Sequence, residues 1–185
     1  MLELIQRLRG RAIPPAIGGG FLVLTLALGF VPGPAASDPA AAQDSFIQAG
    51  DGWATYVNER FGTSLAVPAD FTPAAAPENG DGRRFTSEDA TLEVYAWDNV
   101  DGETAGSLKS RLIGSEGYSD VTYSPSGRSW LVVSGYRGDN IFYEKYFFRG
   151  DTVHGFGMEF PSSEKPYYED IVEEIEDSFR AGWEG

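Results

Sequence analysis

The stretch that decides the fold runs from Ser129 to Phe160 and reads SWLVVSGYRGDNIFYEKYFFRGDTVHGFGMEF. It is rich in β-branched and aromatic residues, which predicts strands over Ser129–Arg137, Ile141–Phe148 and Thr152–Phe160. The connections between them, Gly138-Asp139-Asn140 and Arg149-Gly150-Asp151, consist of residues that favour tight turns. Because tight turns join antiparallel neighbours, we predict an antiparallel meander.

Apolar residues in these strands do not alternate with polar ones. Trp130-Leu131-Val132-Val133 and Tyr146-Phe147-Phe148 place apolar side chains on both faces of the sheet, because successive side chains of a strand point to opposite sides. Both faces must therefore be at least partly covered. We expect an α+β fold, with a single antiparallel sheet of about six to eight strands and helices on both of its faces.

The chain before the meander predicts one more strand, over Asp120–Ser124, and two hairpins. The hairpins join Trp53–Val57 to Thr63–Val67 and Arg83–Ser87 to Thr91–Trp97. Residues 69–82 are rich in Pro, Gly and Asn, which predicts an exposed loop.

Two helices are predicted to cover the sheet. The first spans Glu103–Ile113, with Asp101 as its N-cap, and the second spans Tyr167–Arg180, capped by Ser162 or Ser163. The second helix has an apolar stripe that must dock on the sheet, formed by Tyr168, Ile171, Val172, Ile175 and Phe179. Its other face is acidic, which indicates either a solvated surface or the docking site of a basic partner, and consists of Glu169, Glu173, Glu174, Glu176 and Asp177.

The N-terminus has the pattern of an export signal, with Arg7, Arg9 and Arg11 ahead of an apolar run. The strongly apolar part, residues 21–31, is shorter than the roughly 20 residues that span a bilayer. Ala40-Ala41-Ala42 resembles a cleavage site, and a second such site lies at residues 34–36. We predict a signal peptide over 1–42, with a retained membrane anchor as the alternative, a flexible tether over 43–52 and a single α+β domain over 53–183. The protein is therefore expected in the periplasm or secreted, and on the membrane only if the segment is uncleaved.

The composition is acidic and lacks cysteine. Asp and Glu number 28 against 14 Lys and Arg, so the formal net charge is −14. Such a surface repels phosphate, so we expect no nucleic acid and no direct binding to anionic lipid headgroups, whereas a basic protein partner is favoured. Without cysteine, the chain has neither disulfides nor thiol chemistry.

Several motifs resemble a family of uncharacterised exported alphaproteobacterial proteins. They are WATYVNERFGTSLAVP at 53–68, PENGDGRRF at 77–85, WLVVSGY at 130–136, IFYEK at 141–145 and DSFR at 177–180. More remotely, a hairpin with Asn, Phe-Gly, a strand and Pro, together with a closing helix that ends in Ser-Phe, is similar to the PsbP-like fold. That resemblance implies an α/β/α sandwich with an antiparallel sheet, and a role as an accessory or assembly factor.

Catalytic motifs are missing from the sequence. His154 is the single histidine, and there is no Gly-x-Ser-x-Gly elbow and no cysteine. Ser162 to Lys165 match S-x-x-K, but the S-D-N and K-T-G motifs of that chemistry are absent. The acidic loops at residues 79–82 and 98–103 lack EF-hand spacing. We therefore predict no catalytic residue, no metal site and no cofactor.

Exposed aromatic residues are the remaining candidates for ligand contact. Trp97, Tyr136, Tyr143 and Tyr146 have strand spacing, which fits core packing and also a surface that stacks on sugar rings. With His154, we take Trp97, Tyr136 and Tyr143 as candidate ligand residues. The sequence favours a non-enzymatic accessory domain that binds an unknown protein of the cell envelope. A small envelope hydrolase with carboxylates assembled by the fold and a carbohydrate- or peptidoglycan-binding module are the alternatives.

Overall fold

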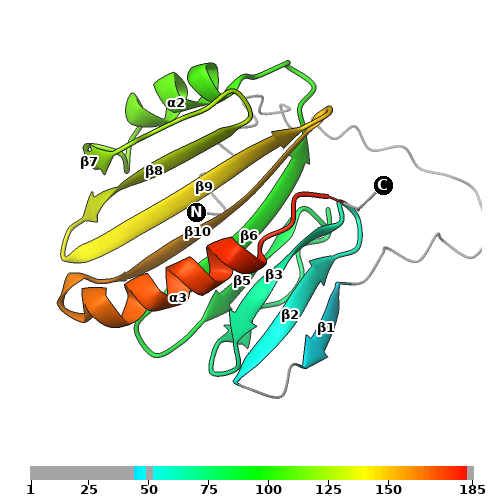
Figure 1. Ribbon diagram of the computed structural model, residues 1–185, viewed down its shortest axis with the longest axis vertical. Coiled ribbons are helices and arrows are strands. Elements are labelled where there is room, and N and C mark those ends of the chain that lie inside the picture. Colours follow the sequence, from blue (N-terminus) through cyan, green and yellow to red (C-terminus); the bar gives the residue numbers. More distant parts are fainter. Residues whose placement is uncertain (1–43, 49–51, 183–185) are drawn as a thin grey trace, which may run out of the picture. The chain divides into compact units, whose positions relative to one another are not determined.

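Two antiparallel sheets and two helices are formed by residues 44–48 and 52–182, the part of the chain that the computed structural model describes (Figure 1). The large sheet has seven strands in the order β4-β5-β6-β10-β9-β8-β7, and the small sheet has the order β1-β2-β3. The fold is thus α+β, but the prediction of a single sheet is wrong. Residues 1–42, predicted to be a signal peptide or anchor, lie outside the described residues.

The small sheet consists of β1 (Ser45–Gln48), β2 (Trp53–Asn58) and β3 (Thr63–Pro68). The predicted hairpin of β2 and β3 is confirmed. The prediction of a flexible tether over 43–52 is wrong at Ser45–Gln48, because β1 pairs with β2 there. The free edge of β3 bonds to the chain that follows the last helix: Ser64 and Arg180 exchange backbone hydrogen bonds. This bridge occupies one position on the edge of β3, and the described strands of the two sheets do not pair with each other.

The large sheet contains both the second predicted hairpin and the predicted meander. Its strands are β4 (Thr72–Pro73), β5 (Gly82–Thr86), β6 (Thr91–Asp98), β7 (Asp120–Tyr123), β8 (Trp130–Arg137), β9 (Asn140–Arg149) and β10 (Thr152–Pro161). Strand β10 pairs with β9 on one side and with β6 on the other. The Tyr95 hydroxyl on β6 donates to the Phe156 carbonyl on β10 at 3.0 Å. The last strand thereby joins the early hairpin to the meander.

The helices begin at other residues than predicted. Helix α2 covers Ala105–Ile113, and its N-cap is Thr104, which forms a capping box with Ser107. Asp101, the predicted N-cap, lies too far before the helix to cap it, because Gly102 turns the chain at φ +63° before the helix begins. Helix α3 covers Lys165–Ser178 after the 3₁₀ turn η1 (Ser162–Glu164), and no side chain caps it. The turn replaces the predicted serine cap, because the Lys165 N–H already donates to the Ser162 carbonyl.

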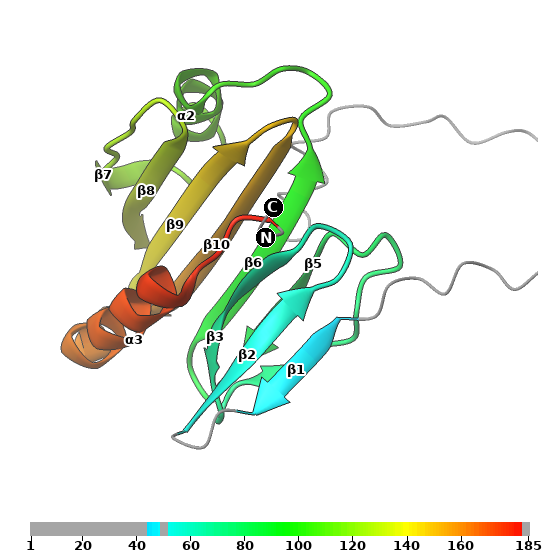
Figure 2. The ribbon, with the colours of Figure 1, turned by 45° about the vertical axis from the view of Figure 1, so that its right-hand side comes forward.

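The main core lies between α3, the small sheet and one face of the large sheet (Figure 2). We call this face the helix face; its side chains include Leu92, Val94, Phe156, Met158 and Ile141. The predicted apolar stripe is buried, with Tyr168, Ile171, Val172 and Ile175 on α3. The helix ends at Ser178 and not at the predicted Arg180, so Phe179 is buried from the extended backbone directly after it. The opposite face, which we call the glutamate face, carries Glu93, Glu144 and Glu159. Within the described ranges, no helix has the length and apolar character that crossing a bilayer requires.

Candidate functional site

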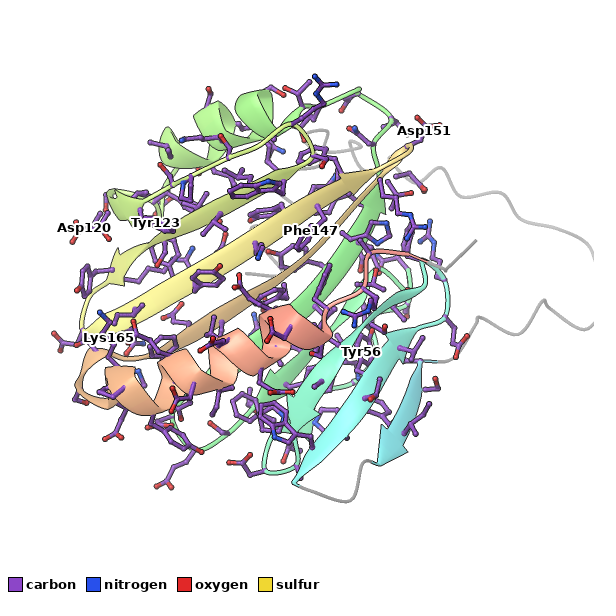
Figure 3. The ribbon with its side chains drawn as sticks, in the orientation of Figure 1. Tyr56, Asp120, Tyr123, Phe147, Asp151 and Lys165 are labelled. Carbon is purple, nitrogen blue, oxygen red and sulfur yellow. The ribbon has the colours of Figure 1, made fainter. Side chains whose placement is uncertain are left out.

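A groove of about 720 Å³ lies on the helix face between α3 and strands β7 and β8. It exists because α3 packs against β10 and β3 and leaves the outer strands of the sheet uncovered (Figure 1). Two of the predicted candidates, Tyr136 and Tyr143, line it together with residues of α3. Tyr123 of β7 and Lys165 of α3 belong to opposite sides of the groove (Figure 3).

Tyrosine side chains dominate the sheet side of the groove. Tyr143 is held in place, because its hydroxyl donates to the Glu176 carboxylate. Burial, and then this carboxylate, raise the pKa of Tyr143. Tyr136 is 41% exposed and Tyr123 is 58% exposed. Neither of these two hydroxyls has a hydrogen-bond partner among the described residues, so both rings and both hydroxyls are available to a ligand.

Carboxylates dominate the helix side of the groove. Glu176 accepts from Lys145 at 2.7 Å, and Glu169 pairs with Lys165 at 3.4 Å. Asp170 and Glu173 also line the groove, and neither has an ion-pair partner in the described part of the chain. The groove therefore combines exposed aromatic rings with negative charge that nothing in the described structure neutralises.

His154 lies elsewhere, buried beneath the small sheet. Its side chain is 2% exposed, and Nδ1 lies 2.7 Å from the hydroxyl oxygen of Thr63 on β3. Burial, and then the nearby Arg149, lower the pKa of His154 to about 4. A catalytic histidine is usually oriented by a carboxylate and reaches a substrate. In the described structure His154 contacts a threonine and is closed off from solvent, so it links the two sheets.

Trp97 points away from the groove. The register pairs Trp97 with Val153, which places it on the glutamate face, and there its ring packs near Tyr95 and Tyr146. Tyr136 and Tyr143 lie on the helix face instead. The four aromatic residues considered for sugar stacking are thus divided between the two faces and do not form one platform.

A buried ionic network on the glutamate face was missed by the sequence reasoning. Glu144 is 0% exposed and accepts hydrogen bonds from Tyr118 at 2.6 Å, Tyr146 at 2.7 Å and Arg137 at 2.8 Å. Burial opposes the charge of Arg137, but Glu144 outweighs it and raises the pKa of Arg137. The sequence signal was a glutamate between aromatic residues of a strand buried on both faces. Because both Glu144 oxygens have partners, this group is a structural element.

Other carboxyl groups with shifted pKa values also lie outside the groove. Burial raises the pKa of Asp44 and that of Glu93. Glu93 nevertheless pairs with Arg84, its neighbour on β5. Neither Asp44 nor Glu93 lines the groove. Among residues 44–48 and 52–182, no three His, Asp or Glu side chains converge as metal ligands.

The described residues have a PsbP-like fold. The chain is similar to CyanoP, the PsbP of the cyanobacterium Synechocystis, with a TM-score of 0.56 and 12% identity over 72% of this chain and 96% of that chain. It is also similar to the Ran-binding protein Mog1p of Saccharomyces cerevisiae, with a TM-score of 0.46 and 9% identity over 76% of this chain and 96% of that chain. No family model and no curated protein matches the sequence. At these identities the likeness to CyanoP concerns the fold alone, and the resemblance to an exported alphaproteobacterial family has no support from these comparisons.

Proposed function

We propose that this protein is an exported, non-enzymatic accessory domain that binds another protein of the cell envelope through the groove between α3 and strands β7 and β8. The observation that carries the proposal is the exposure of Tyr123 and Tyr136 in a groove beside unpaired carboxylates. Large aromatic side chains are ordinarily buried, and tyrosine is enriched among the residues that contribute most to binding at protein interfaces.

The residues of the groove fit recognition better than catalysis. Tyr143 and Glu176 are fixed by their mutual hydrogen bond, which supplies a rigid floor. Tyr136 and Tyr123 present rings with few rotatable bonds, so binding would cost little conformational entropy. The described lining residues include neither a histidine nor an activated nucleophile, and His154 is buried elsewhere. The hydrolase with carboxylates assembled by the fold therefore ranks second.

We also propose how the two helices are arranged on the large sheet. Tyr118, which follows α2, bonds to Glu144 on the glutamate face, while α3 covers the helix face. These contacts support an α/β/α arrangement in which the two helices cover opposite faces of the large sheet. Such an arrangement leaves the groove as an accessible concave part of the helix face.

Export is proposed from the N-terminal sequence alone. The basic residues and the short apolar run favour a cleaved signal peptide, so the mature protein would work in the periplasm or outside the cell. N-terminal sequencing of protein from the envelope fraction is expected to begin near Gln43 or Ser37. A chain that begins at Met1 in a cytoplasmic pool would contradict this.

Site-specific photocrosslinking in living cells tests the proposed binding surface. Benzoylphenylalanine replaces Tyr136 in the groove, and Tyr167 serves as a matched control because it is 55% exposed, aromatic and outside the groove. We expect one discrete protein adduct from position 136 and none from position 167. Absence of an adduct at 136, or the same adduct from both positions, would refute the proposed surface.

Carbohydrate binding is the third candidate, because exposed tyrosines also stack on sugar rings. Titration of the protein with soluble peptidoglycan fragments, followed by ¹H–¹⁵N NMR, separates the two functions. We expect the signals of the groove residues to stay unchanged. Saturable shifts at Tyr123 and Tyr136 would favour the carbohydrate-binding module instead.

A further inference from the structure

We propose that the segment held in this groove is basic, and that it places lysine or arginine side chains against the ring of Tyr136 and the carboxylates of Asp170 and Glu173. This inference rests on the proposed function and adds the chemistry of the partner.

The charge balance of the groove favours a cationic ligand. Among the described residues that line the groove the one cation is Lys165, which already pairs with Glu169. Glu176 is likewise neutralised, by Lys145 from β9. Asp170 and Glu173 remain without a described cationic partner. A ligand that carried positive charge would fill these positions, whereas an acidic ligand would meet repulsion from both of them and from a chain of net charge −14.

Like charges on the exposed side of α3 are unfavourable for the helix without a partner. Glu169 and Glu173 are four residues apart, so they lie on neighbouring turns of one side of the helix and repel each other. The C-terminal end of α3 already has a cation, because the Arg180 guanidinium donates to the Asp177 carbonyl at 2.9 Å. A cation bound beside Glu173 would relieve the repulsion between the two glutamates. The acidic side of α3 therefore opposes the stability of the isolated helix and favours a cationic ligand.

The tyrosine rings of the groove are placed to bind a cationic side chain. Lysine and arginine bind aromatic faces through cation–π attraction, while their aliphatic stems pack on the ring and the charged end reaches outward. The protein already uses such pairs internally, since the Arg137 guanidinium lies 4.1 Å from the centre of the Phe142 ring. Tyr136 offers an exposed ring on the sheet side of the groove, and Asp170 and Glu173 offer carboxylates on the helix side. The groove thus offers both kinds of contact that a long cationic side chain makes, a ring for its stem and a carboxylate for its charge.

The chemistry can be tested with defined peptides. The full chain is titrated with pools of N-acetylated octapeptide amides in which one position is fixed as Arg, Lys, Leu or Glu and the others are randomised. Binding is followed by ¹H–¹⁵N NMR and calorimetry. We expect the Arg and Lys pools to bind about tenfold more tightly than the Glu pool, to shift signals of groove residues, and to weaken as salt is raised.

Variants assign the binding to the groove. The double variant Asp170→Asn with Glu173→Gln removes the unpaired charges and is expected to weaken the Arg pool about tenfold, because two cation–carboxylate contacts are lost. Glu174→Gln is the matched control, because Glu174 is an exposed acid of the same helix that does not line the groove. Tyr136→Phe should retain affinity and Tyr136→Ala should lose it, since the ring face is the contact. These are surface positions, so all variants should fold.

Three results would overturn the inference. One is that the Leu or Glu pool binds as tightly as the Arg pool. Another is that Glu174→Gln weakens binding as much as the double variant does, which would indicate general attraction to an acidic protein. Alternatively, none of the pools binds in the groove. If Tyr136 still crosslinks to a protein in cells in any of these cases, the groove remains a docking site and only the basic partner is refuted.

Discussion

Removal of the Glu144 carboxylate is expected to destabilise the fold more than any surface change. In Glu144→Ala, the hydroxyls of Tyr118 and Tyr146 lose their acceptor in a buried site. Arg137, whose side chain is 19% exposed, keeps only its 3.3 Å contact to Glu159 as an ion pair. Breaking a buried ion pair from one side costs about 3–5 kcal/mol because the other charge stays buried and uncompensated.

The expected loss of unfolding free energy in Glu144→Ala is assigned to the whole network around Glu144. Each buried donor left without an acceptor costs about 1–3 kcal/mol, but contacts within one network are not additive, so the sum is not expected. A loss of about 3–5 kcal/mol is a large part of the 5–15 kcal/mol typical of a domain. Glu144→Gln keeps the shape and one acceptor oxygen, so it should cost less, about 1.5–3 kcal/mol.

Urea unfolding followed by tryptophan fluorescence measures the effect, and the chain contains four tryptophans. Glu174→Ala is the matched control, because Glu174 is exposed on α3. The double variant Glu144→Leu with Arg137→Met removes both charges, so it should recover the part of the loss that comes from the uncompensated Arg137 charge, whereas the hydroxyls of Tyr118 and Tyr146 still lack their acceptor. The reasoning is refuted if Glu144→Ala and Glu174→Ala unfold at the same urea concentration, since Glu144 would then contribute no net stability.

Three further predictions concern the core, a buried histidine and a helix cap. Phe179→Ala should cost about 3–5 kcal/mol in urea melts, because the ring is buried and stacks 4.8 Å from that of Phe147; an unchanged midpoint would mean that the end of α3 is undocked. The pKa of His154 is about 4 when folded, below the value near 6.5 of an unfolded histidine, so the folded state resists protonation. The contribution of neutral His154 to the free energy of unfolding should be complete above about pH 6.5 and decline as the pH falls toward 4. His154→Gln should flatten this part of the stability–pH profile. An identical slope in both proteins would exclude a contribution from His154. Thr104→Ala should cost about 1 kcal/mol and Asp101→Ala less than about 0.5 kcal/mol in thermal melts, and the reverse order would restore Asp101 as the cap.

Local patterns predicted the elements well where turn chemistry and periodicity agree. The glycine turns at residues 138 and 150 and the aromatic strands around them predicted the meander, and β8, β9 and β10 confirm it. The stripe from Tyr168 to Ile175 predicted the buried side of α3 because a helix repeats every 3.6 residues, whereas Phe179 is buried from the extended backbone after the helix. Helix starts were less accurate, since several polar residues near each start can act as a cap and only the turn geometry selects among them.

The groove depended on contacts that no local pattern encodes. Tyr136 and Tyr143 were candidates from the sequence, and so was the acidic side of α3, but their meeting requires α3 to cross the sheet beside β9. Tyr143 and Glu176 are 33 residues apart, and only their hydrogen bond places them in one site. Trp97 is an aromatic residue of a predicted strand, as Tyr143 is, but the strand register places Trp97 on the opposite face of the sheet.

The sequence by itself determined the acidic, cysteine-free character of the protein, the strands of the meander and the buried stripe of its last helix. Each of these depends on composition or on residues a few positions apart, where backbone geometry and side-chain periodicity act directly. Only the tertiary structure decided that β3 ends its own sheet against Arg180, that Glu144 meets Arg137 and two tyrosines in a buried network, and that Tyr136, Asp170 and Glu173 share a groove. Those juxtapositions depend on strand register and helix docking, which are set by packing of the whole core, so distant residues meet only when the chain has folded.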